Sequence, residues 1–202
     1  MERFPVLAKS DLDDRQLALW DELTLGPRGF YTGGAEAKRL PDLYNAWLQF
    51  PEFGKLMVDL GGAVRANTAI PGKLRELVVL TTSALLGAMV EFDFHVPFAA
   101  NEGLSSGLIE ALREKREPPF GDDAERIAWQ ANVQLLRSGA LTHDTREDAI
   151  AAFGYDGLML LIANVTLYVA TAYTTNVARV KLAEDFSADP EKLKDFFAGK
   201  DV

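Results

Sequence analysis

Two carboxylates and one histidine are the residues of this chain whose types and spacing could move protons. Glu91 and His95 lie four positions apart in the stretch MVEFDFHVPFAANEGLS, so both side chains would face the same side of a helix. Glu76 lies upstream, in the stretch KLRELVVL. Burial raises the pKa of a carboxyl group, and a neighbouring carboxylate stabilises a protonated histidine. Such a cluster could donate or accept protons near neutral pH.

These three side chains can meet only if the chain reverses direction between them. In one continuous helix, Glu76 and Glu91 would be roughly 22 Å apart, at 1.5 Å per residue. Gly87 is suited to end a helix, because glycine readily adopts the left-handed conformation found at helix C-termini. We therefore expect one helix over residues 71–86 and a second over residues 89–102, packed against the first.

Simpler interpretations of the three residues remain open. Glu91 and His95 could form an ordinary intrahelical pair, while Glu76 bonds to Arg75 or to a backbone group. The cluster could also hold an iron or manganese ion. However, the only other histidine, His143, lies in LTHDTRED, which is typical of a helix start at the surface. We expect no metal site.

The rest of the sequence is patterned for helices. Apolar residues recur at spacings of three and four, and no alternating strand pattern is visible. Capping boxes pair Asp122 with Glu125 and Asp144 with Glu147, each marking a helix start. The sequence predicts an all-α fold, with helices over residues 10–24, 40–49, 51–66, 71–86, 89–102, 105–116, 122–138, 144–153, 157–181 and 190–198.

Residues 26–39, GPRGFYTGGAEAKR, form the longest expected loop. Its glycines do not match a phosphate-binding loop, because no Gly-Lys-Ser/Thr follows them. Two interpretations stay open: a flexible connector, or a lid that carries Arg28, Phe30 and Tyr31 over a pocket.

Composition narrows the possible partners. The chain has 202 residues and a formal net charge of -9, which argues against binding to nucleic acid or to an anionic membrane surface. Residues 158–178 carry no charge, but they include two asparagines and four threonines. We expect them to form a helix buried in the core or at a subunit interface, and not a membrane span. No secretory signal is visible, so we expect a cytoplasmic protein.

A wider pattern around the three residues resembles the carboxymuconolactone decarboxylase family, within the alkylhydroperoxidase-like superfamily. The pattern is Glu-x-x-x-His-x-x-x-Ala-x-x-x-Gly-Leu-Ser over residues 91–105, preceded by Leu-Arg-Glu-Leu over residues 74–77. The segments GPRGFYTGG, FPEFGKLMVDLGGAVR, DDAERIAWQANVQLLRSGALT and LYVATAYTTNVARV extend it. The resemblance implies a helical extension over residues 1–24, the family domain over residues 25–182, and a C-terminal tail or helix over residues 183–202.

The resemblance also implies an alkylhydroperoxidase-like helical bundle that needs no cofactor and assembles as a homotrimer or homohexamer through its long helices. In one branch of the superfamily, a Cys-x-x-Cys pair precedes the histidine. Here those positions are Ala88 and Glu91, and the chain has no cysteine, so thiol-based peroxide reduction is excluded. In the decarboxylase branch the Glu-x-x-x-His pair is present, although the position of Glu76 is commonly not acidic.

By this resemblance we expect a lyase, decarboxylase or isomerase acting on a small lactone or unsaturated carboxylic acid. His95 would donate the proton to the substrate. Glu91 would orient His95 and return a proton to it, and Glu76 would complete the relay or bind a polar substrate group. Tyr168 could bind the substrate by donating its hydroxyl to an oxyanion, although a core tyrosine is the simpler interpretation. Two alternatives stay open. The chain could be a catalytically silent oligomeric ligand-binding or interaction protein, or it could carry the family's peroxidase or antioxidant name without the thiols that this activity needs.

Overall fold

The computed structural model describes residues 3–182, except for the side chains of Phe30 and Tyr31. Within that range the predicted all-α fold is confirmed. The helix expected over residues 190–198 lies outside the described residues. The elements are η1 Lys9–Asp11, α1 Asp14–Leu25, α2 Gly29–Thr32, η2 Gly34–Glu36, α3 Asp42–Leu48, α4 Pro51–Ala66, α5 Gly72–Leu85, α6 Met89–Asn101, α7 Ser106–Arg113, α8 Asp123–Ser138 and α9 His143–Ala178.

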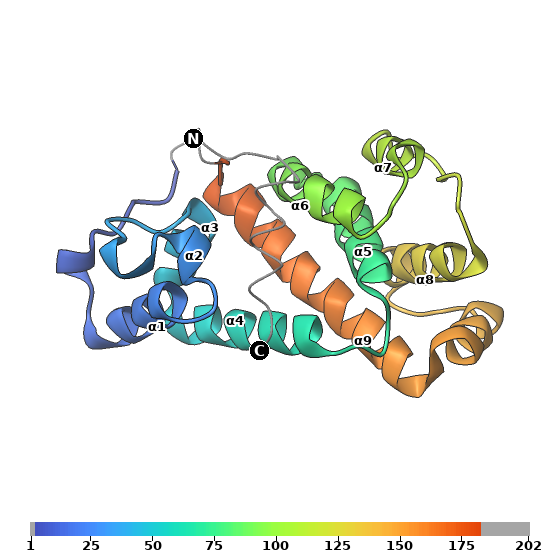
Figure 1. The fold of residues 1–202 in the computed structure, drawn as a ribbon, viewed down its shortest axis with the longest axis horizontal. Helices are drawn as coiled ribbons and strands as arrows, with labels where there is room; N and C mark the ends of the chain where they lie inside the picture. Colours follow the sequence, from blue (N-terminus) through green and yellow to red (C-terminus); the bar gives the residue numbers. More distant parts are fainter. Residues whose placement is uncertain (1–2, 183–202) are drawn as a thin grey trace.

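Helix α9 is the central element of the fold. It crosses the middle of the molecule, with α1–α4 on one side and α5–α8 on the other (Figure 1). It packs against α3, α4, α5, α6 and α8. Leu161 on α9 is fully buried, as are Leu77 and Leu80 on α5 and Phe92 on α6. The core therefore joins α9 to the two helices that carry the proton-moving residues.

The ends of α9 differ in detail from the sequence expectation. The two helices expected over residues 144–153 and 157–181 meet at a kink at Gly154, whose backbone is not helical (φ 67°), so the expected division falls in the right place within α9. The expected cap at Asp144 is wrong: the hydroxyl of Thr142 accepts the backbone N–H of Thr145, so the cap lies two residues earlier and the helix begins at His143. The predicted cap of α8 is confirmed, since Asp122 accepts the backbone N–H of Glu125.

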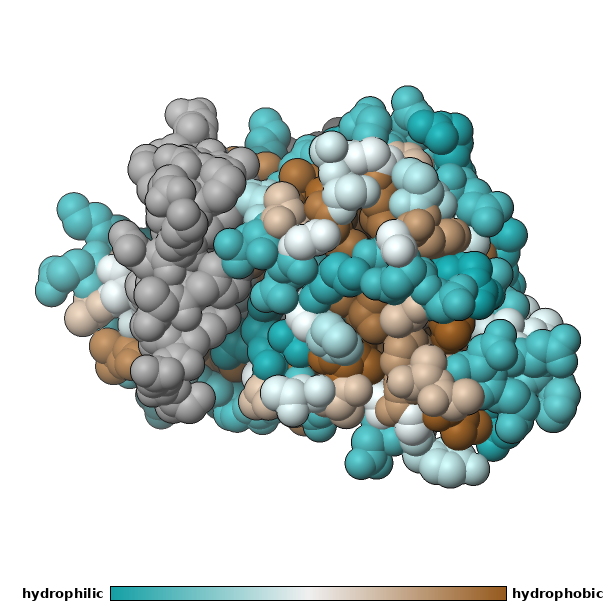
Figure 2. Space-filling model, turned by 45° about the vertical axis from the view of Figure 1, so that its right-hand side comes forward, coloured by the Kyte–Doolittle hydropathy of each residue, from teal (hydrophilic) through white to brown (hydrophobic). Residues whose placement is uncertain are grey.

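The outward side of α9 stays apolar. By length and composition this helix could cross a membrane, and 39% of its most apolar window is buried inside the molecule. Tyr155, Met159, Tyr173 and Val177 are each more than half exposed. Figure 2 shows a face of the molecule on which apolar residues lie exposed among hydrophilic ones. The segment expected to be buried thus has an inner face in the core and an outer face with exposed apolar side chains.

The reversal between α5 and α6 forms at Gly87, as predicted. Gly87 has a φ of 70° and donates its N–H to the carbonyl of Ala84 at 3.2 Å. Ala88 donates to the carbonyl of Ser83 at 2.8 Å. These two hydrogen bonds make a Schellman motif, which satisfies the last carbonyls of α5 and turns the chain. Helix α6 then packs against α5.

Replacing Gly87 by alanine should destabilise the fold by about 1 kcal/mol, because an L-residue is strained at positive φ. The matched control is Gly62→Ala in α4, where an added Cβ would meet nothing within 4 Å. Gly62 lies inside a regular helix, so alanine should stabilise it by about 0.5–1 kcal/mol. Urea unfolding measures both effects. Two shifts of the same sign would contradict this account of the reversal.

Candidate active site

The reversal at Gly87 brings Glu76, Glu91 and His95 together. Glu76 comes from α5, and the other two side chains lie one turn apart on α6. Nδ1 of His95 lies 2.7 Å from Oε2 of Glu76, and Nε2 of His95 lies 3.3 Å from Oε1 of Glu91. Arg75, the alternative partner for Glu76, instead donates to the backbone carbonyls of Asn67 and Ile70. The three side chains therefore form one cluster around the imidazole.

The cluster lies in the interior of the molecule. His95 is 2% exposed, Glu76 6% and Glu91 7%. The rings of Phe94 and Phe98 each lie 5.4 Å from the imidazole, measured between centroids. Charges in such a setting are stable only when they are paired and hydrogen-bonded, which the two carboxylates achieve for the histidine.

Tyr168 and Arg65 connect the cluster to the surface. The hydroxyl of Tyr168, the residue named from sequence as a candidate for substrate binding, comes from α9 and lies 3.3 Å from Nε2 of His95. The guanidinium of Arg65, from the last turn of α4, donates to that hydroxyl at 3.4 Å. Arg65 is exposed to solvent, whereas Tyr168 is buried. A chain of polar groups thus runs from the surface to His95, and sequence reasoning did not single out its outermost member.

The electrostatics make the histidine a cation at neutral pH. Burial opposes its charge, but Glu76 and then Glu91 outweigh burial and raise the pKa of His95 from 6.5 to about 9. Burial favours the protonated form of Glu76, yet the charge and hydrogen bond of His95, with Arg65 and Arg75, lower the pKa of that carboxyl. Burial raises the pKa of Tyr168, which therefore keeps its proton.

The distances assign different tasks to the two carboxylates. Glu76 makes the short contact to Nδ1, so it holds the imidazole in place and stabilises its charge. Glu91 shares Nε2 with Tyr168, at 3.3 Å each. The sequence interpretation gave the orienting task to Glu91, whereas the geometry favours Glu76. Nε2 of His95 thus lies within reach of both Glu91 and the Tyr168 hydroxyl. Among the described residues, no group of three or more His, Asp or Glu side chains could hold a metal ion.

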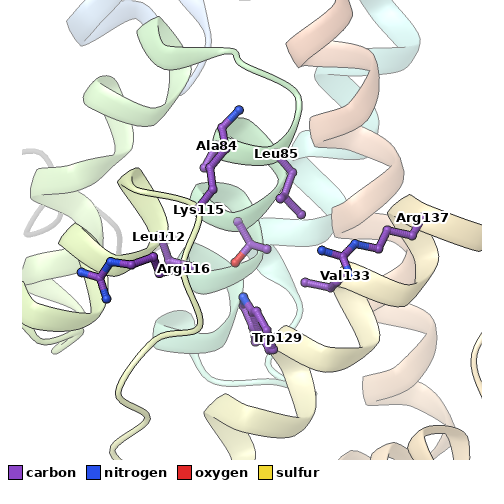
Figure 3. A pocket seen from close by; sticks show the side chains of 9 residues that line it. Ala84, Leu85, Leu112, Lys115, Arg116, Trp129, Val133 and Arg137 are labelled. Atoms are coloured by element: carbon purple, nitrogen blue, oxygen red, sulfur yellow. The ribbon is translucent and has the colours of Figure 1, made fainter.

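Two cavities in the described part of the chain lie away from this cluster. The smaller, about 30 Å³, lies between α5, α8 and the chain around Leu112 to Arg116 (Figure 3). The larger is an apolar groove of about 330 Å³, whose lining includes Trp47, Phe50 and Tyr173. Neither cavity is lined by Glu76, Glu91 or His95.

The segment expected as a loop over residues 26–39 contains α2 and η2. Arg28 is half-buried and donates from Nη2 to the backbone carbonyl of Val58 on α4, at 3.0 Å. The side chains of Phe30 and Tyr31 lie outside the described residues. Of the three side chains that the lid interpretation named, Arg28 is thus turned toward α4.

Residues 51–133, from α4 to α8, match the model of the Carboxymuconolactone decarboxylase family. The match covers less than half of the 202-residue chain. The segment includes Arg65, Glu76, Glu91 and His95. Tyr168 comes from α9, outside the matched residues.

A likeness of fold to solved structures extends beyond the matched segment. The crystal structure of the debrominase Bmp8 without ligand has a TM-score of 0.65 and 16% identity, covering 95% of each chain. A cysteine-to-alanine variant of Bmp8, in complex with 2,3,4-tribromopyrrole, has a TM-score of 0.66 and 16% identity, covering 96% of this chain and 100% of that one. At this identity the likeness concerns the fold alone. No curated protein sequence matches the chain.

Proposed function

We propose that this protein is a cofactor-independent lyase or isomerase that acts on a small lactone or unsaturated carboxylic acid by acid-base chemistry. One observation carries the proposal: a buried imidazole paired with Glu76 at 2.7 Å presents Nε2 to the hydroxyl of Tyr168. The family supports an enzymatic role, since its namesake reaction is a decarboxylation.

In a decarboxylation, the bond to the departing carboxylate breaks and its electron pair enters the unsaturated lactone as an enolate. The enolate carbon then takes a proton, so that substrate carboxylate and one proton give product and CO₂. Tyr168 delivers its hydroxyl proton to that carbon and takes the Nε2 proton of His95 in exchange. Solvent then restores the proton of His95. An isomerase would use the same relay to remove one proton and return it elsewhere.

The charges of the cluster suit this task. A histidine with a pKa near 9 is almost fully protonated at neutral pH, so the acid form is available for every turnover. Glu76 holds Nδ1, which leaves the Nε2 proton as the one that moves. Arg65 donates to the Tyr168 hydroxyl and stabilises negative charge that develops there during proton transfer.

We propose a small-molecule substrate and no nucleic-acid or membrane partner, in line with the net charge of -9. We also propose a cytoplasmic homotrimer or homohexamer, assembled through the outer face of α9. The exposed side chains of Tyr155, Met159, Tyr173 and Val177 support this assembly, because exposed apolar stripes of this length usually meet a partner.

The test is incubation with carboxymuconolactone without any added cofactor, followed by NMR for loss of the lactone and release of CO₂. We expect consumption of the lactone, and no consumption of hydrogen peroxide with a dithiol donor, because the chain has no cysteine. The second candidate is a catalytically silent ligand-binding protein, which the closed packing around His95 favours. Tight binding of the lactone without turnover would select that candidate.

A further inference from the structure

Arg65, at the outer end of the relay, and Arg28 both have neutral hydrogen-bond partners. Arg65 donates to the hydroxyl of Tyr168, and Arg28 donates to the backbone carbonyl of Val58. Within the described part of the chain, neither guanidinium is paired with a carboxylate. A guanidinium has five N–H donors in a planar fork that fits a carboxylate, so both retain donors for one.

The two arginines meet the same part of α4. Nη2 of Arg28 lies 3.4 Å from the position that a Cβ on Gly61 would take, and Leu167 of α9 lies 3.9 Å from it. Arg65 follows Gly61 by four positions, which is one turn of the same helix face. Gly61 therefore leaves room for Arg28 and α9 to lie close to α4, beside the turn that carries Arg65.

The local charge is positive although the chain as a whole is negative. Arg28, Arg65 and protonated His95 give three positive charges, and Glu76 and Glu91 give two negative ones. One positive charge is therefore left over in a chain whose net charge is -9. An anion bound here would neutralise that charge, beside the group that delivers the proton.

We infer that Arg65, with Arg28, binds an anionic carboxylate group that the substrate keeps throughout the reaction, with Tyr168 beside it. This inference rests on the proposed function, and it assigns the substrate a second acidic group. The group that leaves as CO₂ cannot be the one held by the arginines, because an ion pair would stabilise the charge that disappears in the transition state. Arg65 thereby becomes a determinant of substrate specificity.

The experiment uses succinate as the probe, at low and constant ionic strength, because exposed charges are screened by salt. Binding is followed by NMR through the ring signals of His95. We expect succinate to bind the wild type and to raise the titration midpoint of His95, since a nearby anion favours the imidazolium. Neutral succinamide should do neither.

Arg65→Gln should weaken succinate binding about 10-fold or more, the effect of losing a hydrogen bond to a charged group, and should abolish the shift in the His95 midpoint. Arg65→Lys should recover part of both. The matched control is Arg126→Gln on α8, where the arginine pairs with Asp123. It removes the same charge from a residue that contacts Asp123 and Gln130, not the relay, so binding should be unchanged.

The outcomes separate the anion site from the proposed reaction. Arg65-dependent binding of succinate without turnover of carboxymuconolactone would support the anion site and contradict the proposed lyase activity. No binding of succinate to the wild type, or equal weakening by the Arg65 and Arg126 variants, would overturn the anion site whatever the turnover shows.

Discussion

His95→Gln is expected to reduce turnover of carboxymuconolactone by about 10²–10⁴-fold, the usual contribution of a positioned acid-base group. Glutamine can donate a hydrogen bond to Glu76, but it cannot give up and recover a proton near neutral pH. The measurement is the turnover rate of purified protein, with helical content checked by circular dichroism. The glutamine side chain retains a donor toward Glu76, so the fold should remain helical.

The control for this variant is His143→Gln. His143 is exposed at the first residue of α9 and makes no contact with the cluster among the described residues. Its replacement should leave turnover unchanged. A folded His95→Gln protein that works as well as the wild type would show that the imidazole carries no proton in the reaction.

Glu76→Gln is expected to destabilise the protein by about 3 kcal/mol at neutral pH. The pKa of His95 is raised from 6.5 to about 9 in the folded state, mainly through Glu76 acting against burial. A shift of this size corresponds to about 3 kcal/mol, at about 1.4 kcal/mol for each pKa unit. Glutamine removes the carboxylate, so most of this stabilisation disappears. Urea unfolding of both proteins at pH 7 measures the difference.

The pH dependence gives this prediction a second readout. Because the folded pKa of His95 is the higher one, its contribution is fully present below pH 6.5 and is lost as the pH rises through about 9. The pKa of Glu76 is lowered from 4.5, so its contribution is present above pH 4.5 and is lost as the pH falls through the lowered value. The stability difference between wild type and Glu76→Gln should therefore shrink toward both extremes.

Glu91→Gln is the matched control, because it removes the same charge from a second carboxylate beside the same imidazole. Glu91 lies 3.3 Å from Nε2, whereas Glu76 lies 2.7 Å from Nδ1. Replacing Glu91 should therefore destabilise the protein less than replacing Glu76. If Glu91→Gln were the more destabilising variant, the assignment of the orienting task to Glu76 would be wrong.

The convergence of the cluster could be predicted from sequence because two local rules fix it. The spacing of four puts Glu91 and His95 on one helix face, and Gly87 supplies the left-handed turn that lays α6 against α5. Both rules act over a few residues, so a single sequence reveals them. Tyr168 could be named as a candidate, but only tertiary packing sets its distance to His95.

The parts that sequence reasoning missed depend on contacts between distant segments. Arg65 is an ordinary basic residue near a helix end until α9 places Tyr168 beside it, 103 positions later in the chain. The division of tasks between Glu76 and Glu91 depends on distances of 2.7 and 3.3 Å, which no pattern encodes. Thr142 and Asp144 are both residue types suited to cap the start of α9, and in the structure Thr142 is the N-cap.

The most direct test of the central claim is an NMR titration of the His95 ring in the His143→Gln variant, where His95 is the only remaining histidine. The claim is that a buried, carboxylate-held imidazolium stores the proton used in catalysis. It predicts that His95 stays protonated through neutral pH and titrates near pH 9, and that Glu76→Gln lowers this midpoint. A His95 that titrates at or below 6.5, or that does not respond to Glu76→Gln, would contradict it.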